Sequence, residues 1–257
     1  MTEPLSAIIL TRNEESVIER SLESVAWVDE IVVVDALSTD NTKSIATANN
    51  RPWSGKVSFF EREWSGFRDQ RNFSLEKAQN NWVFVLDADE ACSPELKIKI
   101  QEILSSPAPA AKAFKTRRIE YFLGKPIKHG VWNPSYQDRF FYKQGVQYIN
   151  EIHEYPLFPK PALLIHEPIH HYPEFNIEKF LDKMNRYTSV EARDRVSRGQ
   201  RTNLIHLLFA APAMILKNYF YYGAYKDGIH GLIISILEGL SRAVRHVKIW
   251  QYTRNQK

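Results

Sequence analysis

The stretch Trp82-Val83-Phe84-Val85-Leu86-Asp87-Ala88-Asp89-Glu90 decides how the rest of the chain is interpreted. An apolar run of strand-forming residues ends abruptly in two carboxylates at positions i and i+2. In an extended chain this spacing places Asp87 and Asp89 on one face. Two hard oxygen ligands at the end of a buried strand suit a divalent cation and the phosphate groups that it carries.

The flanking sequence alternates strand-like and helical patterns. Strand-like apolar runs occupy residues 5–10, 31–34, 57–60, 113–119 and 137–143. Helical apolar spacing follows the first three runs. Asn13 is the expected cap of the first helix, and Ser93 is the expected cap of a later one. This β-α-β-α order predicts an α/β fold with a mainly parallel, twisted sheet that carries helices on both faces.

Polar side chains follow the predicted strands at the edge where such sheets bind ligands. Thr11 and Asn13 come after the first strand and Asp35 after the second. Asp87 and Asp89 come after the fourth. Core packing explains the apolar runs but not acids at strand ends, so the sequence predicts a ligand site at this edge.

Composition narrows the class of protein. The chain has 257 residues, 44% of them hydrophobic, which is ordinary for a soluble globular protein. The lone cysteine, Cys92, excludes an intrachain disulfide and suits a reducing compartment, where it is expected to be an apolar filler. The N-terminus lacks a basic region followed by an apolar one, so a cytoplasmic location is expected. The basic residues near the C-terminus are diluted by apolar ones, which disfavours nucleic acid as a partner.

The last third of the chain predicts helices. Residues 178–195 and 229–250 have helical patterns, and residues 203–222 are strongly apolar. Pro212 and Lys217 interrupt the apolar stretch, which makes it a poor transmembrane span. Aromatic and basic residues favour an interfacial helix as much as helix packing or a contact in a homo-oligomer.

Several motifs in this order resemble one known family. The motifs are Thr11-Arg12-Asn13-Glu14-Glu15, Val34-Asp35, Leu86-Asp87-Ala88-Asp89-Glu90, Lys128-His129-Gly130-Val131-Trp132, Arg139-Phe140-Phe141 and Ile152-His153-Glu154. Together they resemble family 2 glycosyltransferases with the GT-A (Rossmann-like) fold. The later motifs are similar to the branch of lipopolysaccharide core β-1,4-glucosyltransferases. The resemblance implies a catalytic domain over residues 1–200, with a donor half 1–110 and an acceptor half 111–200, and a C-terminal amphipathic helical region over residues 201–257.

The resemblance also implies an activity. It implies a metal-dependent, inverting hexosyltransferase that moves a sugar, glucose first among the candidates, from a UDP-sugar to a lipopolysaccharide inner-core acceptor. The cofactor would be Mg²⁺ or Mn²⁺. Because that acceptor is linked to a lipid, the protein is expected as a peripheral protein on the cytosolic face of the inner membrane. Polyprenyl phosphate and a peptide side chain remain alternative acceptors, and a non-catalytic sugar-nucleotide sensor remains a second class.

The resemblance assigns roles at the donor site. Asp89 would hold the metal on the donor diphosphate, Asp87 would contact ribose or metal, and a distal histidine, His170 or His171, would complete the metal site. The remaining donor-binding candidates are Thr11, Asn13, Asp35, Arg68 and Arg71. The carboxylate of Asp35 would accept a hydrogen bond from the N3–H of uracil. Arg68 and Arg71 share one helix face.

Inverting transfer also requires a carboxylate that takes the proton of the acceptor hydroxyl. Glu154 is the first candidate for this general base, followed by Glu151 and then Asp138. Acceptor binding is assigned to Lys128, His129 and Trp132, in a loop punctuated by glycine and proline. Cations in this loop would bind the anionic groups of the acceptor, and the indole of Trp132 would stack on a sugar ring.

Overall fold

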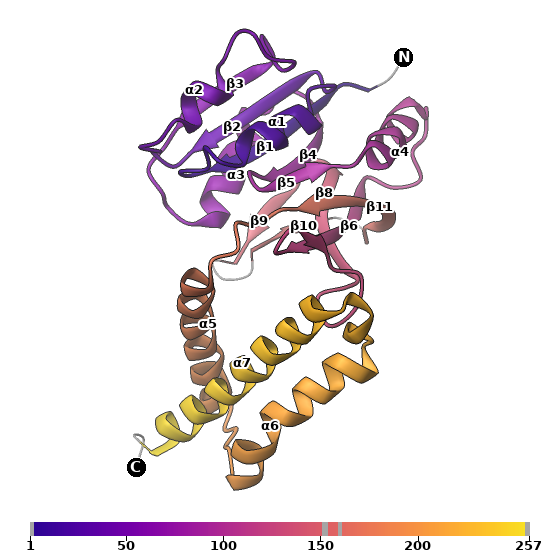
Figure 1. The fold of residues 1–257 in the computed structure, drawn as a ribbon. Coiled ribbons are helices and arrows are strands. Elements are labelled where there is room, and N and C mark those ends of the chain that lie inside the picture. Colours follow the sequence, from indigo (N-terminus) through magenta and orange to yellow (C-terminus); the bar gives the residue numbers. More distant parts are fainter. Residues whose placement is uncertain (1–2, 151–153, 159–160, 255–257) are drawn as a thin grey trace. The chain divides into compact units, whose positions relative to one another are not determined.

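The computed structural model describes residues 3–150, 154–158 and 161–254. Backbone contacts divide the chain into two compact units (Figure 1). Unit 1 consists of Met1–Ile119 and Ser135–Pro173. Unit 2 consists of Glu120–Pro134 and Glu174–Lys257.

Unit 1 is built on one large mixed sheet with the strand order β3-β2-β1-β4-β8-β6-β11-β5. The first four strands in this order are parallel, whereas β4–β8, β8–β6 and β11–β5 pair antiparallel. The strands of this sheet are β1 (Leu5–Thr11), β2 (Glu30–Asp35), β3 (Val57–Glu61), β4 (Trp82–Asp87), β5 (Glu90–Cys92), β6 (Ala113–Phe122), β8 (Ser135–Tyr142) and β11 (Leu163–His171). Two short strands, β9 (Gln147–Ile149) and β10 (Tyr155–Leu157), form a separate antiparallel pair.

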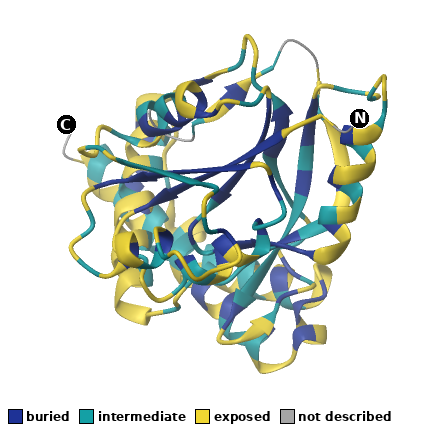
Figure 2. Cartoon of the chain, turned by 90° about the horizontal axis from the view of Figure 1, so that it is seen from above, coloured by how far each residue is buried: buried dark blue, intermediate teal, exposed yellow. Residues whose placement is uncertain are grey.

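The central strands are buried on both faces, as Figure 2 shows in dark blue. Alternate residues along a strand enter different apolar clusters, because successive side chains of a strand point to opposite faces. Ile9 of β1 belongs to the cluster with α1 and α4, and Ile8 belongs to the cluster with Leu75 of α3. Helices therefore cover both faces, and the predicted α/β fold class is confirmed.

Of the four helices that the structure describes in unit 1, α4 alone has a side-chain hydrogen bond at its N-cap. The helices are α1 (Ile18–Ser24), α2 (Thr42–Ala46), α3 (Phe67–Lys77) and α4 (Pro94–Ser105). Ser93 caps α4 as predicted, because its hydroxyl accepts the N–H of Leu96 at 3.1 Å. The prediction that Asn13 caps the first helix is wrong. The amide oxygen of Asn13 accepts the N–H of Thr39 instead, and α1 begins only at Ile18.

Unit 2 is mainly helical. Its elements are β7 (Lys125–Pro126), which pairs with the end of β6, α5 (Ile177–Ser197), α6 (Leu204–Leu216), the π-helical turn η1 (Lys217–Tyr221), the 3₁₀ turn η2 (Ala224–Asp227) and α7 (Ile229–Arg254). Its small core gathers Phe122, Ile127 and Ile234. The two helices predicted at residues 178–195 and 229–250 are confirmed as α5 and α7.

Cys92 lies in β5 and is buried. Burial raises the pKa of its thiol to about 12, although the nearby charge of Lys97 acts in the opposite direction. The thiol therefore stays protonated near neutral pH. Cys92 is the apolar filler that the sequence predicts.

Candidate functional site

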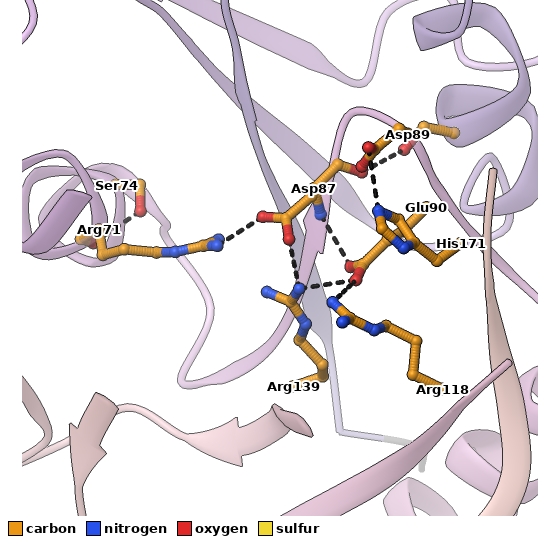
Figure 3. A network of polar contacts seen from close by, with 9 residues as sticks. Arg71, Ser74, Asp87, Asp89, Glu90, Arg118, Arg139 and His171 are labelled. Carbon is orange, nitrogen blue, oxygen red and sulfur yellow. Dashed lines mark hydrogen bonds and ion pairs between the residues drawn. The ribbon is translucent and has the colours of Figure 1, made fainter. Parts of the chain in front are cut away.

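Asp87 is held between two buried arginines at the end of β4 (Figure 3). Arg71 of α3 donates to one carboxylate oxygen and Arg139 of β8 donates to the other, each at 2.5 Å. Burial by itself would raise the pKa of Asp87, but the charges of Arg139 and Arg71 outweigh burial and hold that pKa well below its usual range. Asp87 is therefore an anion at any physiological pH, and both its oxygens are already engaged.

Glu90 extends this ionic network. Its side chain is fully buried, and Oε1 accepts from Arg139 at 2.7 Å and lies 3.3 Å from Arg118. The other oxygen accepts the backbone N–H of Asp87 at 3.0 Å. Glu90 thus fixes both the backbone of Asp87 and the arginine that binds its side chain.

Asp89 has different neighbours from Asp87, although only one residue separates them. β4 ends at Asp87, the chain turns at Ala88–Asp89, and β5 begins at Glu90. Oδ2 of Asp89 lies 3.0 Å from Nε2 of His171, and both side chains are partly exposed. The expectation that both carboxylates share one face assumed an extended strand, and the turn separates their partners.

The pairing of β11 with β5 brings His171 to Asp89. The antiparallel register sets His171 opposite Glu90, next to the Asp89 turn. His170 is the neighbouring residue in the same strand, and its ring lies 6.0 Å from that of Tyr172. Because alternate strand residues face opposite sides, only one of the two histidines can reach Asp89. The choice that the sequence left open falls geometrically on His171.

Asp89 and His171 fit a divalent cation as a pair of ligands. One carboxylate oxygen and one imidazole nitrogen are ligand types that Mn²⁺ accepts, and Mg²⁺ is commonly bound by one or two carboxylates together with substrate phosphates. No group of three His, Cys, Asp or Glu side chains converges as a metal site within the part of the chain that the structure describes. A cation here would therefore need oxygens from a ligand, and Asp87 would have to give up an arginine to join it.

The predicted nucleobase reader, Asp35, is buried at the end of β2. Its oxygens accept the N–H of Ser38 at 2.7 Å and the Ser38 hydroxyl at 2.5 Å, which closes a turn. Thr11 pairs with Asp35 in the β1–β2 register, and its buried hydroxyl oxygen has no hydrogen-bond partner among the described residues. A buried, unpaired hydroxyl beside Asp35 is consistent with a ligand at this edge.

Of the other predicted donor residues, Arg71 belongs to the ionic network, whereas Asn13 and Arg68 have other partners. Asn13 has φ of 55° and binds the loop at Ser38 and Thr39. Arg68 lies 2.9 Å from Asp69 at the surface, while Arg71 is buried against Asp87. Arg68 and Arg71 therefore contact different groups, although both are on α3.

The three candidate general bases lie in different surroundings. Asp138 lies on β8, 3.5 Å from Lys115. Burial raises the pKa of Asp138 although the charge of Lys115 lowers it, and a raised pKa makes this carboxylate a stronger base. Glu154 is half-buried and directly precedes β10. Glu151 lies outside the described residues.

The predicted acceptor residues belong to unit 2. The buried Asp227 carboxylate accepts the N–H groups of Lys128 and His129 and lies 3.1 Å from Nδ1 of His129. Trp132 donates its indole N–H to Glu238 at 2.9 Å and packs edge-on against Phe122. These contacts attach the loop to η2 and α7, and the indole of Trp132 contributes to the packing of unit 2.

Three residues of the ionic network were absent from the predicted site: Glu90, Arg118 and Arg139. A charge within a buried strand needs a partner, so Arg139 next to Phe140 and Phe141 was a usable signal. No local pattern identifies the partner, since Glu90 and Arg139 are 49 residues apart.

Comparison with known sequences decides the family. The profile of Glycosyl transferase family 2 matches residues 6–162, more than half of the chain. The chain belongs to this family. This glycosyltransferase is 28% identical over 271 residues to an uncharacterized glycosyltransferase of Rickettsia conorii, with 100% of this chain and 93% of the relative covered.

A named relative and a solved structure are also similar to this chain. The lipopolysaccharide core biosynthesis glycosyltransferase LpsC of Rhizobium meliloti is 27% identical over 266 residues, with 96% of this chain and 92% of LpsC covered. Among solved structures, the mannosyltransferase PcManGT from Pyrobaculum calidifontis, in complex with GDP-Man and Mn²⁺, has a TM-score of 0.54 at 15% identity. That match covers 96% of this chain and 88% of PcManGT, and it confirms the GT-A fold.

Proposed function

We propose that this glycosyltransferase moves a sugar, glucose as the first hypothesis, from a UDP-sugar to an inner-core sugar of lipopolysaccharide, with inversion and with Mg²⁺ or Mn²⁺. The observation that carries the proposal is the pair of Asp89 and His171, 3.0 Å apart beside the arginine-bound Asp87. The named relative LpsC supports lipopolysaccharide as the acceptor class.

Asp89 and His171 would hold the cation. When bound, the cation supplies Lewis-acid stabilisation of the leaving diphosphate. His171 must be neutral to act as a ligand, and a cation bound at Nε2 would replace the contact that this nitrogen makes with the carboxylate of Asp89.

The ionic network would position the donor. Arg71, Arg118 and Arg139 face two carboxylates, Asp87 and Glu90, so these side chains carry one excess positive charge. That excess favours an anionic ligand such as a nucleoside diphosphate. Asp87 stays ionised and held in place by two guanidinium groups, so it would contact the ribose rather than the metal.

A carboxylate would take the proton of the acceptor hydroxyl as the new glycosidic bond forms. Glu154 remains the first candidate, Glu151 the second and Asp138, whose pKa is raised by burial, the third. Replacement by the isosteric amide separates them. The variant among Glu154→Gln, Glu151→Gln and Asp138→Asn that loses turnover yet keeps UDP affinity identifies the base.

The acceptor would be bound in part by the loop that carries Lys128 and His129, whose ammonium and imidazole N–H groups would donate to its phosphate and carboxylate groups. A lipid-linked acceptor and a soluble donor would place the reaction at the cytosolic face of the inner membrane. Polyprenyl phosphate is the alternative acceptor to include in the assay.

The test is calorimetric binding of UDP in Mn²⁺ and then in EDTA, with wild type, Asp89→Ala and the exposed control Glu102→Ala. We expect metal-dependent binding in wild type and the control, and its loss in Asp89→Ala. Transfer is then assayed with a panel of UDP-sugars on truncated lipopolysaccharide cores. No UDP binding under either condition would overturn the proposal, and binding without transfer to any acceptor would favour a sensor.

A further inference from the structure

The helix α6 is apolar except for His206. Together with η1 it forms the stretch Leu204–Tyr221, which by length and composition could cross a membrane and of which almost nothing is buried. A surface helix of a globular protein ordinarily has one polar face. The two faces of α6 have different surroundings.

The inner face of α6 is packed on α7, and the two helices lie side by side in Figure 1. The ring of His206 stacks on that of His246 at 5.2 Å. Further along, Ile215 approaches Gly239 so closely that an added Cβ would lie 2.5 Å from it. The side chain of Asn218, in η1, donates to Ser235 at 3.0 Å. The helices are thus an antiparallel pair, joined along the length of α6.

The outer face of α6 has no such partner among the described residues. Large apolar side chains recur there at spacings of four residues. They are Leu204, Ile205, Leu208, Phe209 and Leu216 of α6, continued by Phe220 of η1, and Leu216, the least exposed of them, is 56% exposed. Exposure of so many apolar side chains on one stripe is typical of an interaction surface.

The surrounding charges indicate which partner fits. The chain contains no acidic residue between Asp194 and Asp227, but Arg201, Lys217 and Lys226 are exposed in that interval. Aromatic residues follow at the end of the stripe, at Tyr219–Tyr222, and Lys217 lies 5.3 Å from the ring of Tyr222. Apolar residues bordered by tyrosines and cations match the boundary between acyl chains and anionic headgroups.

The pairing with α7 argues for a helix that lies in the membrane plane. Arg242 on α7 contacts Met214 of α6, and Glu238 and Arg245 lie on the same helix. If α6 spanned a bilayer while attached to α7, these charges would enter hydrocarbon at a large free-energy cost. An in-plane helix buries only its outer face.

We propose that the outer face of α6 binds an anionic lipid surface, with the helix parallel to the membrane. Binding through this face does not depend on which sugar is transferred or on which acceptor receives it.

The test is flotation of the full-length protein with phosphatidylcholine vesicles and with vesicles of equimolar phosphatidylcholine and phosphatidylglycerol. We expect wild type to float with the anionic vesicles. Leu208→Ser/Phe209→Ser should lower the partition coefficient by roughly tenfold or more for each residue. Ile98→Ser, on α4, is the matched control, since Ile98 and Leu208 are both 58% exposed. Lys217→Ala should lower binding to anionic vesicles roughly fivefold.

Several outcomes would overturn the proposal. They are wild type that does not float, a double variant that floats like wild type, and bound protein that only detergent releases, which would indicate a span. A dimer by light scattering without lipid, absent in the double variant, would assign the face to a second copy. Circular dichroism checks folding, and Ile205→Ser/Phe220→Ser tests the same face if the first variant unfolds.

Discussion

The ionic network at the end of β4 and the outer face of α6 depart from the usual distribution of residues in opposite ways. In the network, charged side chains such as Glu90 and Arg139 are buried, and each meets an opposite charge. On α6, apolar side chains such as Leu208 and Phe209 are exposed. Neither arrangement is what stability alone favours.

The two departures differ in their energetic consequences. Buried charges carry a desolvation cost that only well-placed partners offset, so the network depends on all its members. Exposed apolar side chains lower the stability of the isolated protein only slightly. They contribute favourable free energy only when a partner molecule covers them. Substitutions should therefore destabilise the fold in the first region and leave it intact in the second.

The largest effect is expected for Arg139→Met. The variant leaves Asp87 with Arg71 alone and Glu90 with Arg118 alone, so we expect the free energy of unfolding to fall by about 3–5 kcal/mol. Lys99→Met removes a cation from the exposed pair with Glu102 and should cost less than about 1 kcal/mol. Urea denaturation measures both, and equal costs would mean that the network is no more than a surface ion pair.

A smaller effect is expected at the contact of α6 with α7. An alanine at Gly239 would overlap Ile215, and the overlap costs about 1–3 kcal/mol, of which the better helix propensity of alanine offsets about 1 kcal/mol. The exposed substitution Leu208→Ser should stay within about 0.5 kcal/mol of wild type. Thermal and urea denaturation compare the two, and a large cost for Leu208→Ser would show that this face is covered by protein.

The smallest effect is expected in the acid dependence of stability. The pKa of Asp87 is lower in the folded protein than in the unfolded chain, where it is about 3.9. The carboxylate of Asp87 therefore stabilises the fold fully when the pH is above its unfolded-state pKa, and this stabilisation is lost as the pH falls below that value. Between about pH 5 and pH 3, wild type should lose stability more steeply than Asp87→Asn. Parallel curves from urea midpoints would contradict the assigned ion pairs.

Much of the catalytic fold could be predicted because its signals are local. The apolar runs at β1, β2 and β4 were identified to within a residue or two at each end, and the acids at their ends follow directly from the chain order. Asp89 was a predicted metal ligand because its motif is contiguous. The roles of Glu154 and of the acceptor loop stay predictions.

The remaining contacts of the site could not be predicted from residues that are close together in the sequence. β11 was missed as a strand, so the sequence left His170 and His171 equivalent, and the register of β11 on β5 placed His171 at Asp89. The apolar stretch at residues 203–222 indicated a helix, but only its packing on α7 showed which face is exposed.

The sequence by itself determined the alternation of strands and helices, the carboxylates at the strand ends and the family of the protein. The tertiary structure decided the partners of those carboxylates and the exposed face of α6. The physical reason is that periodicity and capping depend on residues a few positions apart. A strand register or a helix contact instead depends on the packing of segments far apart in the chain, 82 residues apart for Asp89 and His171.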